Sequence, residues 1–212
     1  PAAAVIAGKA VPPIPPLGQR IAVARDVAFG FAYAATLEGW RDSGAELAFF
    51  SPLSDEAPAA DADAVFLPGG YPELHAGRLA ANAGFLGGLR RAAQRGAAIY
   101  GECGGYMMLG EGLVDAGGTR HAMAGLLPAV TSFAERRLHL GYRQARLLAD
   151  GPLGRSGATF RGHEFHYASV VSEGDSPPLF AAQDARCRDL GSLGRRQGSV
   201  LGSFLHLIDR AP

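Results

Sequence analysis

Short apolar segments alternate with longer segments of helical pattern over the first half of the chain. The apolar segments predict strands at residues 20–25, 46–52, 63–70 and 97–101. Two intervening segments, residues 31–44 and 79–96, carry apolar side chains at helical spacing and end on a glycine. Strands that alternate with helices of this length favour an α/β fold, with a mostly parallel central sheet and helices on both faces.

The pattern changes in the second half of the chain. Three further predicted strands, at residues 136–150, 158–173 and 198–207, are separated by turn residues instead of helices. Strands joined without a crossover helix pair antiparallel. We therefore expect an antiparallel extension on the parallel core.

The N-terminal residues differ from the rest. They contain the sequence "PPIPP", which is typical of a stiff, extended spacer. We expect residues 1–19 to be an inter-domain linker and residues 20–212 to form one folded domain. A chain that starts in a linker is expected to be part of a longer protein.

Composition excludes several classes of function. Lys plus Arg and Asp plus Glu both number 20, so no basic surplus indicates a nucleic acid or a membrane surface as partner. No apolar stretch reaches the roughly 18 residues of a transmembrane helix. The two cysteines, Cys103 and Cys187, are too few for a disulfide framework, so we expect a cytoplasmic protein.

Cys103 stands in "YGECGGYMML", where a predicted strand meets a helix-forming segment. Gly-x-Cys-x-Gly is typical of a nucleophile elbow, in which glycines permit a tight turn that raises the sulfur above the sheet. The N–H groups of the following helix lower the pKa of a thiol and can bind an oxyanion. A small buried cysteine in a glycine-rich loop fits this stretch equally well.

Two other stretches favour the catalytic interpretation. "FLPGGYPEL" places Gly69 and Gly70 in a turn directly after a predicted strand, at the same edge of the sheet as Cys103. "GSFLHLID" places His206 at the end of an apolar segment. A cysteine nucleophile needs a base near neutral pH, and histidine fills that role best.

These stretches, together with "RGHEFHY" at residues 161–167, resemble the class I glutamine amidotransferase domain of the cobyrinic and hydrogenobyrinic acid a,c-diamide synthases, enzymes of cobalamin biosynthesis. The resemblance covers about residues 20–209 and implies a flavodoxin-like α/β fold. It implies that Cys103 attacks glutamine to form a thioester and that His206 acts as general base and acid. Backbone N–H groups at Gly69, Gly70 and Gly104 would hold the oxyanion or the substrate.

The resemblance also implies a partner domain. Ammonia would pass to an N-terminal P-loop synthetase domain, absent here, which uses ATP and Mg²⁺ to activate a corrinoid carboxylate. The segment "AAAVIAGKA" lacks the first glycine and the Ser or Thr of a phosphate loop. We therefore expect no cofactor in this domain. Which corrinoid is amidated stays open.

The third member of the catalytic group stays open too. Many class I amidotransferases carry a glutamate two residues after the histidine, where this sequence has Ile208. Glu164 and Asp209 are candidate orienting acids, and Glu102 either binds substrate or braces the elbow.

Several other polar residues near these motifs have more than one interpretation. His163 and His166 would point to opposite faces of a strand, which disfavours a metal site, so we expect no metal and hydrogen-bonding roles for both. Tyr71 and Glu73 either line the glutamine pocket or form the turn. Cys187 is expected to be a bystander.

Two other functions remain as alternatives. A cysteine-nucleophile α/β-hydrolase also uses a Gly-x-Cys-x-Gly elbow and places its histidine last in the chain. A catalytically degenerate amidotransferase-like domain could serve as a docking surface. Such a copy usually loses the cysteine or the histidine, and this chain keeps both.

Overall fold

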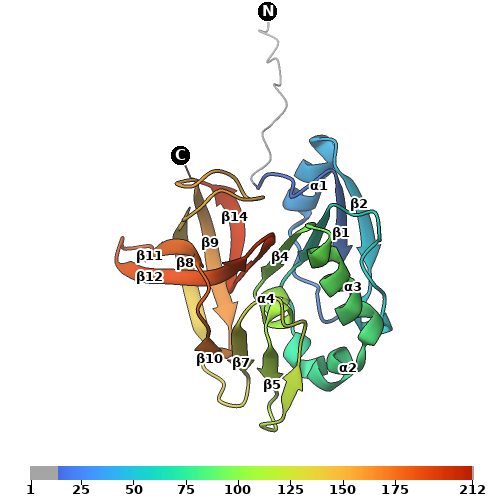
Figure 1. Ribbon diagram of the computed structural model, residues 1–212. Helices are drawn as coiled ribbons and strands as arrows, with labels where there is room; N and C mark the ends of the chain where they lie inside the picture. Colours follow the sequence, from blue (N-terminus) through green and yellow to red (C-terminus); the bar gives the residue numbers. More distant parts are fainter. Residues whose placement is uncertain (1–13, 212) are drawn as a thin grey trace, which may run out of the picture.

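The computed structural model describes residues 14–211 and shows two halves that share one sheet (Figure 1). The sheet has ten strands in the order β14-β9-β8-β11-β12-β13-β4-β3-β1-β2. One half is parallel. Its strands are β2 (Glu46–Phe50), β1 (Arg20–Ala24), β3 (Ala64–Leu67), β4 (Ala98–Glu102) and β13 (Val200–Ser203).

The other half of the sheet is antiparallel. Its strands are β12 (Asp189–Gln197), β11 (Pro178–Asp184), β8 (His139–Leu147), β9 (Thr159–His166) and β14 (Leu205–Arg210). The sheet curls strongly, because β14, the edge strand of this half, returns to β4 in the middle of the sheet. There the backbone N–H of Leu207 donates to Oε1 of Glu102 at 3.1 Å.

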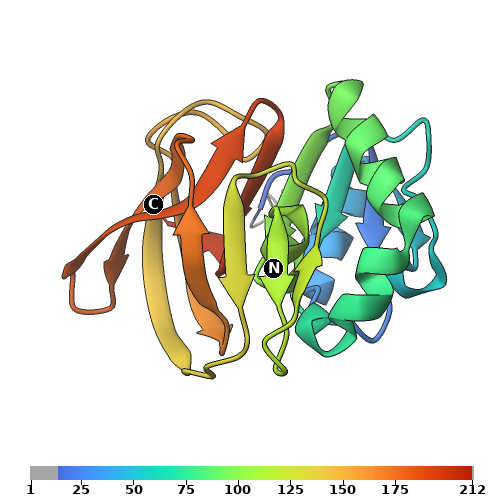
Figure 2. The same cartoon turned by 60° about the horizontal axis from the view of Figure 1, so that its bottom comes forward.

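Helices cover both faces of the parallel half. Helix α1 (Ala34–Asp42) packs Trp40 against Phe66 on one face, with ring centroids 5.3 Å apart. Helices α2 (Ala76–Ala81), α3 (Ala83–Gln94) and α4 (Gly104–Leu109) cover the other face. Figure 2 shows α2 and α3, in green, on the outside of this half.

A smaller sheet of four strands lies beside α4. Its order is β10-β7-β5-β6, with β5 (Gly112–Val114), β6 (Arg120–Ala122), β7 (Ala129–Ser132) and β10 (Ser169–Glu173). Among the described residues, no helix is long and apolar enough to cross a bilayer.

The fold class predicted from the sequence is confirmed, but three predicted elements are divided, and five strands have no counterpart in the prediction: β5, β6, β7, β11 and β12. The predicted helix 79–96 is divided at Asn82, whose side chain donates to the carbonyl of Pro52 at 2.7 Å while its backbone leaves helical geometry. The predicted strand 158–173 forms β9 and β10, which belong to different sheets. The predicted strand 198–207 is divided at Phe204, because β13 pairs with β4 and β14 with β9.

Part of the expected linker packs on the domain. Ile14 and Leu17 are buried, and the indole N–H of Trp40 donates to the carbonyl of Ile14 at 3.0 Å. The carboxylate of Asp63 accepts the backbone N–H of Arg20 at 2.9 Å. Residues 1–13, which include Pro12 and Pro13, are outside the described residues.

Candidate active site

Cys103 lies in a sharp turn between β4 and α4. Its backbone has φ 49° and ψ −106°, a left-handed conformation that is uncommon for a residue with a side chain. Such strain is found at functional sites, where the surrounding structure holds it in place. The turn makes Cys103 the residue that precedes the first turn of α4.

The elbow requires a glycine after the nucleophile. A Cβ at Gly105 would collide with the carbonyl oxygen of Leu67, at the end of the neighbouring strand β3. Only a residue without a side chain lets α4 begin this close to the sheet. The backbone N–H of Cys103 donates to the carbonyl of Ser203 at 2.8 Å, which ties the turn to the end of β13.

The thiol of Cys103 is buried, with 3% of the residue exposed. Burial, followed by the carboxylate of Glu73, raises the pKa of Cys103 to about 12, and hydrogen bonds from the backbone N–H groups of Gly104 and Gly70 oppose this rise. Two N–H donors therefore converge on the sulfur. Backbone N–H groups at such a turn are suited to bind the oxyanion that forms beside the sulfur.

The imidazole of His206 lies against the turn that follows β3. A Cβ at Gly69 would collide with Cε1 of His206, so only glycine leaves room for the ring. His206 is 2% exposed, and its Nε2 has no hydrogen-bond partner in the part of the chain that the structure describes. Burial, then the neighbouring His163 and His166, lowers the pKa of His206 to about 4. The imidazole is therefore neutral at pH 7 and able to accept a proton.

The Gly69–Gly70 turn brings the two predicted catalytic residues together. The backbone N–H of Gly70 is near enough to the sulfur of Cys103 to favour the thiolate, and Gly69 packs against Cε1 of His206. The sulfur itself lies 3.8 Å from the carbonyl oxygen of Phe165, on β9. A buried thiol, a neutral imidazole and two N–H donors are the parts that nucleophilic acyl transfer requires.

A cleft of about 300 Å³ opens beside the histidine. It is lined by Phe31, Ala32, Tyr33, His163, Phe165 and His206. Cys103 does not line the cleft. A larger cleft of about 620 Å³ lies between β1, β2 and α1 and contains neither Cys103 nor His206.

Glu102 connects the two catalytic strands. Its carboxylate accepts the backbone N–H of Leu207, so the residue before Cys103 holds the residue after His206. Glu102 is 4% exposed, and burial raises its pKa to about 8, opposed by the hydrogen bond from Leu207. Glu102 is therefore protonated at neutral pH. This geometry fits the bracing role considered for Glu102.

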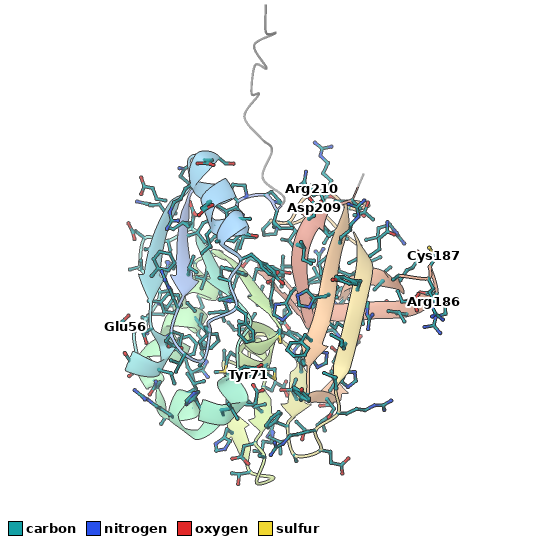
Figure 3. All side chains as sticks on the ribbon, turned by 180° about the vertical axis from the view of Figure 1, so that it is seen from behind. Glu56, Tyr71, Arg186, Cys187, Asp209 and Arg210 are labelled. Atoms are coloured by element: carbon teal, nitrogen blue, oxygen red, sulfur yellow. The ribbon has the colours of Figure 1, made fainter. Side chains whose placement is uncertain are left out.

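The two candidate orienting acids do not contact His206. Glu164 is bound by Arg143, whose Nε donates to Oε2 at 2.7 Å. Asp209 lies beyond a bulge in β14 and pairs with Arg161 at 3.7 Å. Figure 3 shows Asp209 beside Arg210 at one end of the molecule.

Glu73 and Tyr71 follow the Gly69–Gly70 turn. Glu73 is 7% exposed in the short 3-10 helix Pro72–His75, and its Oε2 has no hydrogen-bond partner in the described part of the chain. Burial raises the pKa of Glu73 to about 7. The ring of Tyr71 packs edge-on against Phe31, with centroids 5.1 Å apart.

Of the remaining predicted residues, His163 joins this centre and Cys187 lies apart from it. Within residues 14–211, no group of three or more His, Cys, Asp or Glu side chains could hold a metal ion. His166 stacks on His139 at 4.6 Å, whereas His163 stacks on His206. Cys187 is exposed at the outer edge of the antiparallel half (Figure 3).

Two contacts of the centre have no clear signal in the sequence. Tyr33 belongs to a segment of helical pattern, yet its hydroxyl hydrogen-bonds to Nε2 of His163. The carbonyl of Phe165 meets the sulfur of Cys103, and a backbone contact leaves no trace in the side-chain pattern.

Comparisons with solved structures agree with the fold. PurLQS from Thermotoga maritima superimposes with a TM-score of 0.58 at 17% identity, covering 88% of this chain and 86% of that chain. A glutamine amidotransferase from the same organism superimposes with a TM-score of 0.55 at 15% identity, covering 88% and 75%. At these identities the likeness concerns the fold alone.

Sequence comparison goes further. A hydrogenobyrinate a,c-diamide synthase from Sinorhizobium sp is 62% identical over 200 residues, which cover 92% of this chain and 44% of that protein. Its counterpart from Brucella anthropi is 58% identical over 199 residues, covering 94% and 45%. The chain thus spans less than half the length of these curated relatives.

A family model gives the same assignment. The model of the CobB/CobQ-like glutamine amidotransferase domain matches residues 20–211, nearly the whole chain. The elbow, the Gly-Gly turn and the terminal histidine all fall within the match. The chain belongs to the family of CobB/CobQ-like glutamine amidotransferase domains.

Proposed function

We propose that this chain hydrolyses glutamine through Cys103 and His206. His206 takes the proton of the thiol through Nε2, and the sulfur attacks the side-chain amide carbon of glutamine. The N–H groups of Gly70 and Gly104 bind the oxyanion that forms. His206 then returns the proton to the leaving nitrogen, ammonia departs and a glutamyl thioester remains.

Water completes the cycle. His206 takes a proton from the water as the water attacks the thioester carbonyl, and the sulfur leaves as the thiol once it regains a proton from His206. The products are glutamate, ammonia and the original enzyme. The observation that carries the proposal is the shared turn, because Gly69 contacts the imidazole and Gly70 the sulfur.

The described conformation is a resting state of this machinery. Its thiol faces the carbonyl of Phe165, and Nε2 of His206 is free of hydrogen bonds to the described residues. With the pKa of Cys103 near 12 and that of His206 near 4, both groups are neutral at pH 7. Engagement of the pair requires the thiol to turn from the carbonyl of Phe165 toward the imidazole, and closure by a partner domain commonly completes such geometry.

We infer the wider role from the relatives. As in the diamide synthases of Sinorhizobium and Brucella, the ammonia would serve the a,c-diamidation of hydrogenobyrinate in cobalamin biosynthesis. The rest of such a protein would be a P-loop synthetase that binds ATP, Mg²⁺ and the corrinoid. We place this activity in the cytoplasm.

Replacement of the nucleophile tests the proposal. In the complete natural protein, Cys103→Ser should abolish release of glutamate and ammonia from glutamine, and Cys187→Ser should leave both unchanged. Full glutaminase activity in Cys103→Ser would refute the role of the sulfur. Hydrolysis of simple esters without hydrolysis of glutamine would favour the α/β-hydrolase alternative instead.

A further inference from the structure

In residues 14–211, neither candidate acid orients His206. Among the residues that the structure describes, Glu164 binds Arg143 and Asp209 pairs with Arg161. An imidazole without support can turn about its side-chain bonds, and a base that is misplaced by about 1 Å loses about 100-fold in rate. Something else must therefore hold the ring.

The ring of His163 lies flat on that of His206. The two residues are direct neighbours across β9 and β14. Their ring centroids are 4.9 Å apart, and their planes differ by 3°. The edge of the ring, at Cε1, meets Gly69, so His206 has His163 on one face and the Gly69 turn at its edge.

A hydrogen bond holds His163 in turn. Its Nε2 bonds to the hydroxyl of Tyr33. In the tautomer that carries its proton on Nδ1, Nε2 accepts and the Tyr33 hydroxyl donates. Burial lowers the pKa of His163, which keeps this ring neutral.

We propose that His163 is the positioning residue for His206, and that Tyr33 fixes His163 for this role. The stacked ring takes the place of the orienting acid. This inference rests on the proposed function, since it assumes that His206 is the base.

The stack also suits the charge that forms during the reaction. When His206 takes the thiol proton it becomes a cation, and the face of a neutral aromatic ring attracts a cation. A protonated His163 would repel it, and this charge repulsion is how His163 lowers the pKa of His206. The hydroxyl of Tyr33, which can donate to Nε2, favours the neutral form of His163.

Three variants of the complete natural protein test the proposal through glutamine hydrolysis. His163→Ala should lower kcat by about 10- to 100-fold and change KM by less than about 3-fold, because positioning affects the chemical step and not substrate binding. His163→Phe keeps a flat ring over His206 and should recover most of the lost kcat. Tyr33→Phe removes one hydroxyl and should lower kcat less than His163→Ala does.

Two matched variants serve as controls. Tyr142→Phe removes the hydroxyl of an exposed tyrosine that lies opposite His163 in the register of β8 and β9. His121→Ala removes a histidine of β6 that lies outside the cleft and pairs with Asp115. Both should retain the kcat and KM of the parent protein.

The outcomes separate the two proposals. If the parent protein does not hydrolyse glutamine, the proposed function fails. If the parent is active, a parental kcat in His163→Ala, or a rise in KM alone, overturns the positioning role. Should the alanine variant not fold, Tyr33→Phe decides in the same way, since a parental kcat contradicts the proposal and a lower kcat at unchanged KM supports it.

Discussion

The buried carboxyl of Glu102 should make the free energy of unfolding depend on pH, and this effect can be measured without an activity assay. Its pKa rises from 4.5 to about 8 on folding because the residue is removed from water. The folded chain thus keeps a proton that the unfolded chain releases. The contribution of Glu102 to stability is therefore fully present below about pH 4.5 and is lost as the pH rises toward 8.

The size of the effect follows from the two pKa values. A difference between 4.5 and about 8 corresponds to about 5 kcal/mol in the free energy of unfolding. Between about pH 5 and about pH 7.5 the part lost is about 3 kcal/mol. Glu102→Gln removes the titration, while its amide oxygen can still accept the N–H of Leu207.

Urea unfolding of the 212-residue chain measures this loss. Trp40 is the single tryptophan and is buried, so its fluorescence reports unfolding. Relative to the parent, Glu102→Gln should gain about 3 kcal/mol in stability between about pH 5 and about pH 7.5. The same substitution at exposed Glu135 should show no such gain. A parallel pH dependence in parent and Glu102→Gln would refute the assignment of a neutral, buried Glu102.

Three further predictions concern the site. Gly69→Ala should lower the rate of glutamine hydrolysis by about 100-fold, because the added Cβ collides with His206. Gly151→Ala, whose Cβ meets nothing within 4 Å, should keep the parental rate. Equal rates in the two variants would contradict the packing of Gly69 on His206. The acid limb of kcat/KM for glutamine should lie nearer to pH 4 than to 6.5, because His206 must be neutral to act as base, so a limb at 6.5 would contradict the buried imidazole. Iodoacetamide should label exposed Cys187 before buried Cys103, whereas a glutamine-analogue electrophile should label Cys103, and peptide mass spectrometry identifies the labelled residue. Labelling of Cys103 by iodoacetamide before Cys187 would contradict the burial of Cys103.

The sequence predicts the fold class and the principal motifs because these depend on local patterns. Alternation of apolar and helical segments identifies the parallel half, and the carboxyl ends of its strands share one edge. The Gly69–Gly70 turn follows β3 and Cys103 follows β4, so their convergence could be foreseen. The same logic does not reach the antiparallel half.

The rest of the centre depends on contacts between distant segments. The apolar run that contains Phe204 looks like one strand, and periodicity cannot show that β13 and β14 pair with different neighbours. The curl that returns Leu207 to Glu102, and the register that stacks His163 on His206, arise from this pairing. The acids nearest in sequence, Glu164 and Asp209, are therefore a poor guide to what holds the imidazole.

Trapping of the covalent intermediate tests the central claim most directly. The complete natural protein is mixed with glutamine, quenched in acid during turnover, digested and examined by mass spectrometry. The account predicts a glutamyl group on the peptide that contains Cys103, and none in the His206→Ala variant. A glutamyl group on Cys187 alone would contradict the role of Cys103. So would the absence of any cysteine adduct when another covalent glutamyl intermediate is detected as glutamate accumulates.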